Sequence, residues 1–197
     1  MGEPPQKKPS SGSFDTEDLE KIGKQAREII EQIDLSSVGK FIPRKIIPPV
    51  YFITAVVLMW ALSRYAPGSH LIYIPLRVFG GLLALAGLAM TAHAAWTFKQ
   101  YGTAIKPFDK PTQLVTSGLF QYTRNPMYLG MMLMLIGFWI ALGTFSPVII
   151  IPVFFVIIQE GFIKYEEAFM EEHFGNAYLD YKDRVFRWAG RRLDEQG

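Results

Sequence analysis

The sequence predicts an all-α fold, a polytopic membrane protein with about four transmembrane helices. Three long stretches contain no Asp, Glu, Lys or Arg, namely Ile46–Ser63, Val78–Phe98 and Asn125–Gln159. A helix of about 20 apolar residues crosses the hydrocarbon core of a bilayer, so each of the first two stretches predicts one span. The third stretch is long enough for two spans, and the Gly-Thr-Phe-Ser-Pro sequence at 143–147 predicts a tight turn between them.

The expected transmembrane helices run over Ile46–Tyr65, Leu71–Phe98, Pro126–Leu142 and Pro147–Ile163. The alternative, a set of buried helices in a soluble protein, is disfavoured because four such stretches in 197 residues leave little polar surface to cover them. Small residues in the second helix predict the close approach of a neighbouring helix. These residues are Gly80, Gly81, Ala84, Gly87 and Ala95.

Polar segments surround the predicted spans. Residues 1–14 are rich in Pro, Gly, Ser and Lys and are predicted to be disordered. Residues 15–45 are predicted to hold an N-terminal amphipathic helix and a linker, because apolar residues recur at helical spacing up to Ile33. That helix either lies on the membrane surface or packs on its own protein. Residues 46–197 form the expected membrane domain, which ends in a helical tail with a break near Gly175.

The charge distribution predicts the orientation of the chain. Basic residues concentrate in the N-terminal segment, the loop at 99–123 and the tail, so the positive-inside rule places both termini in the cytoplasm. The net charge of +2 gives no indication of nucleic-acid binding. The chain has no cysteine and its three histidines are far apart, so we expect neither a disulfide nor a metal site. The first 45 residues are polar, so no signal peptide is expected.

The most distinctive motif stands where a polar loop meets the third predicted span. Arg124-Asn125-Pro126 opens that span, and proline suits the first turn of a helix because its missing N–H has no partner there. At the membrane boundary, Arg124 can bind a carboxylate or a phosphate. The alternative is an interfacial arginine whose side chain extends toward water.

Two acidic residues, Glu166 and Glu167, follow the fourth predicted span. Either one carboxylate binds a cationic group such as an ammonium, or both belong to a solvated acidic helix face. Further on, the tail combines aromatic and basic residues, which suits either anchoring at the headgroup level or a role in ligand binding. These residues are Tyr178, Tyr181, Arg184, Arg187 and Trp188. His93, a polar residue within the second span, is a further functional candidate.

Taken together, these blocks resemble the isoprenylcysteine carboxyl methyltransferase family, including its bacterial relatives and the phospholipid methyltransferases. The resemblance covers the C-terminal half of the chain and rests on several blocks in the same order. The blocks are Trp96, Lys106-Pro107, Leu114–Gly118, Arg124–Gly130, Glu166-Glu167, Phe174-Gly175, Tyr178, Tyr181 and Arg184-Val185. The resemblance implies a small helical enzyme of the bacterial inner membrane that transfers a methyl group from S-adenosyl-L-methionine.

The resemblance also implies a set of site residues on the cytoplasmic side. Carried over by position, the residues that line the cofactor pocket are Gln113, Leu114, Val115, Phe120, Asn125, Pro126, Met127, Tyr128 and Glu166. Glu166 is expected to meet the methionyl ammonium. The expected catalytic residues are Arg124, Tyr128 and Glu167. The expected acceptor is a lipid or another hydrophobic small molecule, and an amine acceptor would need Tyr128, Glu167 or His93 to take its proton.

Three positions depart from the eukaryotic prenylcysteine enzymes. Asn125 and Thr112 each stand where those enzymes have His, and Phe162 stands where they have an Arg thought to contact the substrate carboxylate. Asn at the first position is common among the bacterial members, so cofactor binding is still expected. The missing Arg argues against a prenylcysteine carboxylate as the substrate.

Two other functions compete with methyl transfer. One is an NADPH-dependent membrane enzyme similar to the sterol reductases, although the chain has no dinucleotide fingerprint. The other is a non-catalytic membrane adaptor that docks its partner through the N-terminal amphipathic helix.

Overall fold

The computed structural model describes most of the predicted membrane domain. It covers Lys24, Gly39, residues 42–43, and residues 47–69, 74–102 and 112–191. The predicted disordered segment at 1–14 lies outside the described residues, and so does the predicted amphipathic helix except for Lys24.

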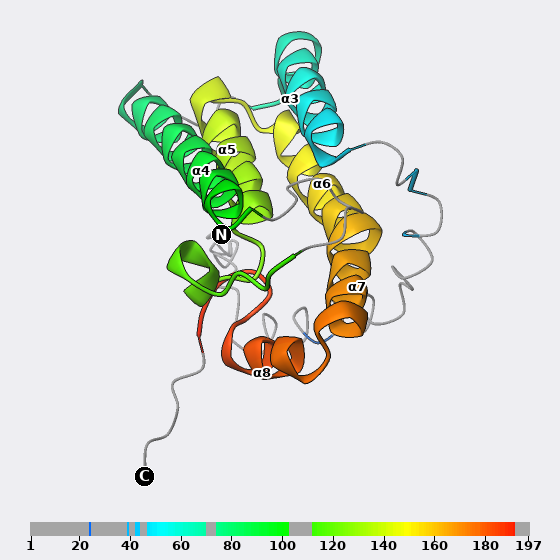
Figure 1. Cartoon of the computed structure of the whole chain (residues 1–197). Helices are drawn as coiled ribbons and strands as arrows, with labels where there is room; N and C mark the ends of the chain where they lie inside the picture. The colour runs from blue at the N-terminus through cyan, green and yellow to red at the C-terminus, as the bar shows by residue number, and fades with distance from the viewer. Residues whose placement is uncertain are drawn as a thin grey trace, which may run out of the picture. The chain divides into compact units, whose positions relative to one another are not determined.

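The described part of the chain is built from helices (Figure 1). The elements are α3 (Pro48–Tyr65), α4 (Ile74–Gln100), the 3₁₀ turn η1 (Gly118–Gln121), α5 (Pro126–Leu142), the 3₁₀ turn η2 (Ser146–Ile149), α6 (Ile150–Ile158), the π-helical turn η3 (Gln159–Ile163), α7 (Lys164–Phe174) and α8 (Asn176–Arg184). Within these residues no strand is present, and one isolated bridge joins Val185 to Arg191. The all-α class is therefore confirmed.

Helices stand at all four predicted spans. α3 and α5 end where the sequence predicted, and α4, described from Ile74 onward, ends at Gln100, two residues beyond the predicted end. Two helical stretches of the described chain are long and apolar enough to cross a membrane, Pro75–Gln100 and Ser146–Phe174, and α5 is a shorter apolar helix. A topology of four spans therefore stays a prediction.

The turn between α5 and η2 forms where glycine and proline predicted it. Gly143 has a left-handed backbone conformation, with φ of 73°, and its N–H donates to the carbonyl of Trp139. A glycine at this position ends a helix at low steric cost. The indole N–H of Trp139 also donates to the carbonyl of Thr144, at 3.0 Å, and Pro147 lies in the first turn of η2.

Helices α4 and α5 are in contact through glycines. A Cβ on Gly87 would lie 2.5 Å from the carbonyl oxygen of Gly130, and a Cβ on Gly80 would lie 2.7 Å from the carbonyl oxygen of Gly137. Both distances are shorter than any side chain tolerates, so the two backbones touch only because these side chains are absent. Gly81, in contrast, faces open space.

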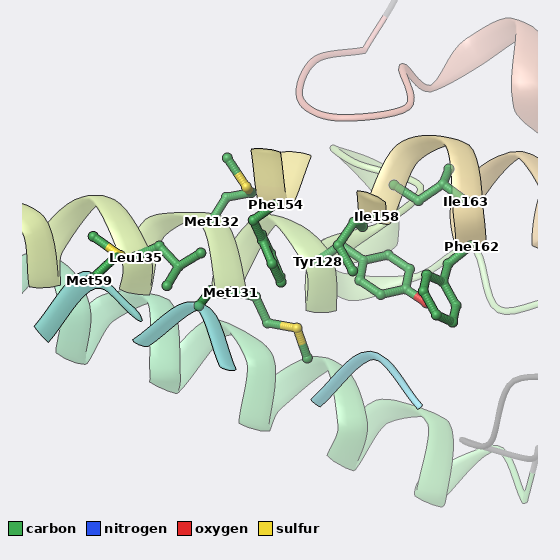
Figure 2. Close-up of a cluster of buried hydrophobic side chains, with 10 residues drawn as sticks. Met59, Tyr128, Met131, Met132, Leu135, Phe154, Ile158, Phe162 and Ile163 are labelled. Atoms are coloured by element: carbon green, nitrogen blue, oxygen red, sulfur yellow. The ribbon is translucent and has the colours of Figure 1, made fainter. Parts of the chain in front are cut away.

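The main core joins α3, α5, α6 and η3 (Figure 2). Met59 of α3 and Leu135 of α5 lie at one end of this cluster, and Phe154 of α6 lies in the middle of it. At the other end, Tyr128 of α5 lies next to Phe162 of η3. The core therefore leads directly to the residues of the predicted site.

The outer faces of α3 and α4 are strongly apolar. The exposed large side chains of these two helices include Val50, Ile53, Val57, Leu58, Trp60, Leu76, Val78, Phe79, Leu82, Leu85 and Leu88. Between them lies an apolar groove of about 240 Å³. It is lined by Phe52 and Val56 of α3, Gly81, Ala84, Leu85 and Leu88 of α4, and Met134 and Phe138 of α5. A large exposed apolar surface of this kind suits contact with lipid.

The tail is helical with a break, as predicted. α7 ends at Phe174, Gly175 has a φ of 53°, and α8 begins at Asn176. Residues 185–191 then form a non-helical segment, here called the C-terminal turn. This turn folds back on the loop that precedes α5.

Candidate functional site

Several polar residues of the predicted site come together where α5 and α7 begin. Tyr128, in the first turn of α5, donates a hydrogen bond of 2.6 Å to Glu166 Oε1, in the first turn of α7. Asn125 caps the start of the same helix, since its carbonyl accepts from the N–H of Leu129. The structure therefore brings the Arg-Asn-Pro-Met-Tyr motif and the two glutamates to one end of the helix bundle.

Glu167 lies between two arginines. Arg187 donates twice to it, from Nε to Oε1 at 3.0 Å and from Nη2 to Oε2 at 2.6 Å. Arg124 Nη2 lies 3.2 Å from the same Oε1. The Glu167 side chain is 6% exposed, so the two guanidinium groups replace most of the water that a carboxylate needs. The hydrogen bonds to Glu167 raise the pKa of Arg187.

Arg124 keeps unused hydrogen-bond donors. Its side chain is 8% exposed; the Tyr178 hydroxyl interacts with the guanidinium, and among the described residues Nε and Nη1 have no hydrogen-bond partner. Buried donors are almost always paired in proteins, and an exception calls for an explanation such as a missing ion or ligand. Arg124 is thus placed to bind an additional acceptor group.

The C-terminal turn forms one side of the site. The N–H of Gly190 donates to the Tyr122 carbonyl at 2.8 Å, and the N–H of Arg124 donates to the Phe186 carbonyl at 3.1 Å. The side-chain amide of Asn125, a predicted cofactor ligand, donates from Nδ2 to the Arg187 carbonyl at 3.0 Å. Asn125 is only 9% exposed, and in this structure its side-chain amide binds the C-terminal turn.

The loop before α5 presents apolar side chains to the same region. Val115 and Phe120 are buried against Ala94 of α4 and pack with Met127 of α5. Phe120 also accepts, through its carbonyl, a hydrogen bond of 2.7 Å from the hydroxyl of Tyr181. Three residues of the predicted cofactor pocket thus contact one another.

The remaining predicted residues lie nearby in different environments. Leu114 packs against the tail, with Tyr178 and Tyr181, whereas Gln113 is exposed and Pro126 is fully buried at the start of α5. Burial raises the pKa of both tyrosine hydroxyls above the usual range.

His93, the candidate from the second span, lies beside the loop. A Cβ on Gly118 would be 3.9 Å from its Nε2, and the imidazole contacts the ring of Trp96. The His93 side chain is exposed.

Phe162, one of the three departures noted in the sequence, is a core residue here. It is 1% exposed and packs edge-to-face on Tyr51, with ring centroids 5.6 Å apart. This side of the site is therefore apolar, as Figure 2 shows for Phe162 beside Tyr128.

Sequence reasoning missed two features of the site. It left Arg187 and Trp188 open between anchoring at the headgroup level and ligand binding, and did not predict their contacts within the protein: Arg187 binds Glu167, and Trp188 stacks on Phe155 and donates from Nε1 to Gln159 Oε1 at 3.0 Å. It also passed over Glu160, whose buried carboxylate accepts from Lys164 at 2.6 Å. A signal for Glu160 was available, since this residue is the first charge after the charge-free stretch that begins at Asn125.

Comparison with known proteins agrees with this arrangement. The sequence profile of the phospholipid methyltransferase family matches residues 76–177, just over half of the 197 residues. The chain belongs to this family. The matched region begins in α4 and ends in α8, so it contains the motif at Arg124 and both glutamates.

Named relatives match over shorter segments. The chain is 31% identical over 80 residues to a protein-S-isoprenylcysteine O-methyltransferase of Schizosaccharomyces pombe, and 34% identical over 76 residues to protein-S-isoprenylcysteine O-methyltransferase B of Arabidopsis thaliana. These matches cover 39% and 37% of the chain, and 33% and 37% of the two relatives. The chain therefore spans about a third of the length of these enzymes.

A third relative, an uncharacterised protein of Haemophilus influenzae, is 34% identical over 62 residues. This match covers 32% of the chain and 98% of the relative. The family membership and the apolar helices together support a membrane protein.

Proposed function

We propose that this protein transfers a methyl group from S-adenosyl-L-methionine to a lipid or another hydrophobic small molecule, at the cytoplasmic face of a membrane. One observation carries the proposal: within the region matched by the family, Glu166 accepts from Tyr128, and its neighbour Glu167 pairs with Arg124, whose Nε and Nη1 have no hydrogen-bond partner among the described residues. These groups offer opposite charges to one ligand.

The residues fit the amino-acid part of the methyl donor. That part is a zwitterion, with an ammonium and a carboxylate on one carbon. Glu166 Oε1 already accepts from Tyr128, and its carboxylate has further acceptor positions that suit an ammonium. Arg124 Nε and Nη1 suit a carboxylate. Val115, Phe120 and Met127 supply a buried apolar surface next to the motif, as the nucleoside part requires.

Methyl transfer from this donor requires the protein mainly to align the donor and the acceptor. When bound, the donor supplies a methyl group on a positively charged sulfur, and the acceptor's lone pair forms the new bond as the carbon–sulfur bond breaks. The main contributions of the protein are to hold the reactants in line and to exclude water. Arg124 and Glu167 serve best as binding and organising groups, because both carboxylate oxygens of Glu167 are engaged by arginines.

A lipid-like acceptor agrees with the apolar surroundings. Phe162 packs on Tyr51 in the core that also holds Tyr128, so the described side chains around these rings are mainly apolar. The groove between α3, α4 and α5 is lined only by apolar side chains and is suited to a hydrocarbon chain. A hydrophobic acceptor would reach it directly from the bilayer.

The proposed topology has four spans and cytoplasmic termini. α3, α4, α5 and the run from η2 to η3 would each cross the membrane, which in this proposal is the inner membrane of a bacterium. The basic residues around the site support a cytoplasmic location by the positive-inside rule.

Incubation with a methyl-labelled donor and a total lipid extract tests the function. The full chain in detergent should transfer label to a lipid-soluble product that mass spectrometry identifies. Glu166→Gln should lower the transfer strongly, whereas the matched variant Glu172→Gln, at an exposed position of the same helix, should not. Lack of label in every lipid fraction, together with a reaction that depends on NADPH, would support the reductase alternative.

A further inference from the structure

We propose that Arg187, in the C-terminal turn, is a positioning residue of the methyl-donor site; this inference rests on the proposed methyl-transfer function. Arg187 binds the glutamate block with its side chain and the Arg-Asn-Pro block with its backbone. A single residue of the tail thereby fixes the relative placement of the two blocks.

The side chain of Arg187 fixes the orientation of Glu167. Its Nε and Nη2 reach both carboxylate oxygens, at 3.0 Å and 2.6 Å. Such a two-pronged contact determines the plane of the carboxylate as well as its position. Because Arg124 Nη2 lies 3.2 Å from the same Oε1, the orientation of Glu167 helps to orient the guanidinium of Arg124. The unpaired donors of Arg124 are thus aimed by Arg187 acting through Glu167.

The backbone of Arg187 acts on the second block. Its carbonyl accepts from Asn125 Nδ2 at 3.0 Å and from Thr123 Oγ1 at 3.4 Å. Asn125 immediately precedes α5, one turn before Tyr128, which binds Glu166. The position of Arg187 is therefore coupled to the carboxylate that we assign to the donor ammonium.

The turn that carries Arg187 is held firmly on both sides. On one side, backbone hydrogen bonds join Phe186 and Gly190 to the loop before α5. On the other side, Trp188 stacks on Phe155, with ring centroids 4.9 Å apart, and donates to Gln159 at the start of the π-helical turn. Arg187 is therefore unlike a tail residue that faces the lipid headgroups, because the side chain of such a residue would be solvated and variable in position.

Lysine cannot replace arginine in this role. A lysine at 187 would keep the positive charge but would present a single point of contact instead of a planar fork. Glu167 would then be free to turn, and Arg124 with it. The loss should appear as weaker donor binding, with little change in the binding of the acceptor.

The test compares Arg187→Lys with Arg184→Lys in the full chain. Arg184 is a matched control, because it lies in the same tail, is exposed, and donates from Nε only to the backbone of Asp180 among the described residues. The affinity for S-adenosylhomocysteine, a donor analogue that cannot react, is measured by calorimetry, and KM for donor and acceptor is measured separately. We expect about tenfold weaker analogue binding and a raised donor KM for Arg187→Lys, from the loss of a hydrogen bond to a charged group, and no change for Arg184→Lys.

Two results separate positioning from a purely structural role. A lower unfolding temperature of Arg187→Lys with unchanged analogue affinity would overturn the inference while the proposed function stands. Failure of the wild-type chain to bind the analogue would overturn the proposed function itself.

Hydrogen exchange on the wild-type chain keeps the inference testable if Arg187→Lys does not fold. The analogue should slow amide exchange at Arg124 and Gly190, whose N–H groups tie the turn to the loop. Binding of the analogue without any added protection at these amides would contradict the positioning role.

Discussion

The Tyr128 hydroxyl donates a 2.6 Å hydrogen bond to Oε1 of Glu166, and this contact joins the first turn of α5 to the first turn of α7. The two residues are 38 positions apart in the chain. Tyr128 also belongs to the main core. The contact therefore connects the packing of the helix bundle to the carboxylate that we assign to the methyl donor.

Tyr128→Phe should destabilise the protein. The substitution removes the donor to Glu166 but leaves the ring in the core, so a carboxylate oxygen loses its partner at a cost of about 1–3 kcal/mol. Thermal unfolding in detergent measures this effect. An unchanged unfolding temperature would mean that water replaces the hydroxyl without cost.

Replacing Gly87 with Ala should separate α4 from α5. A Cβ at this position would lie 2.5 Å from the Gly130 carbonyl oxygen, so overpacking should cost about 1–3 kcal/mol. Gly81→Ala, six residues earlier in the same helix, is the control, because a Cβ there meets nothing within 4 Å. Equal unfolding temperatures for the two variants would contradict the close approach of the helices.

Gly81→Leu should impair the acceptor more than the donor. Gly81 lines the apolar groove, and a Cβ at this position meets nothing within 4 Å. A leucine side chain should therefore take up space that we assign to the acceptor's hydrocarbon chain. We expect a higher KM for the acceptor and an unchanged affinity for S-adenosylhomocysteine. If both parameters match those of the wild-type chain, the groove does not serve the acceptor.

The tail should lose stability at alkaline pH. Burial raises the pKa of Tyr178 and Tyr181 above the ordinary value of 10.0, so the folded state keeps protons that the unfolded state releases. The stability that depends on these protonated hydroxyls is present below pH 10.0 and falls as the pH rises toward the folded-state pKa. Unfolding temperatures measured against pH should decline less steeply for Tyr178→Phe. A slope equal to that of the wild-type chain would show that Tyr178 titrates normally.

The sequence predicted the helices well because their signals are local. Three local signals place α5 at Pro126–Leu142: it contains no charged residue, it begins with a proline, and a glycine follows its last residue. The same signals place the end of α3 at Tyr65. The composition did not predict that the fourth helical stretch continues through the π-helical turn into α7.

The site was predicted less completely, because its contacts connect residues far apart in the chain. The order of the motifs predicted that Tyr128 and Glu166 line the same pocket, and in the structure the two side chains are in contact. The inward position of Arg187 depends on how the chain turns back after α8, which a short aromatic and basic segment does not encode by spacing. The ion pair of Arg124 with Glu167 depends on the same turn, because Arg187 of this turn holds the Glu167 carboxylate next to Arg124.

Calorimetric titration of the purified chain with S-adenosyl-L-methionine tests the central claim most directly. The account predicts saturable binding by the wild-type chain. It also predicts about tenfold to a hundredfold weaker binding by Glu166→Gln, from the loss of a charged hydrogen bond, and unchanged binding by Glu172→Gln. No binding by the wild-type chain, or equal binding by all three proteins, would contradict it.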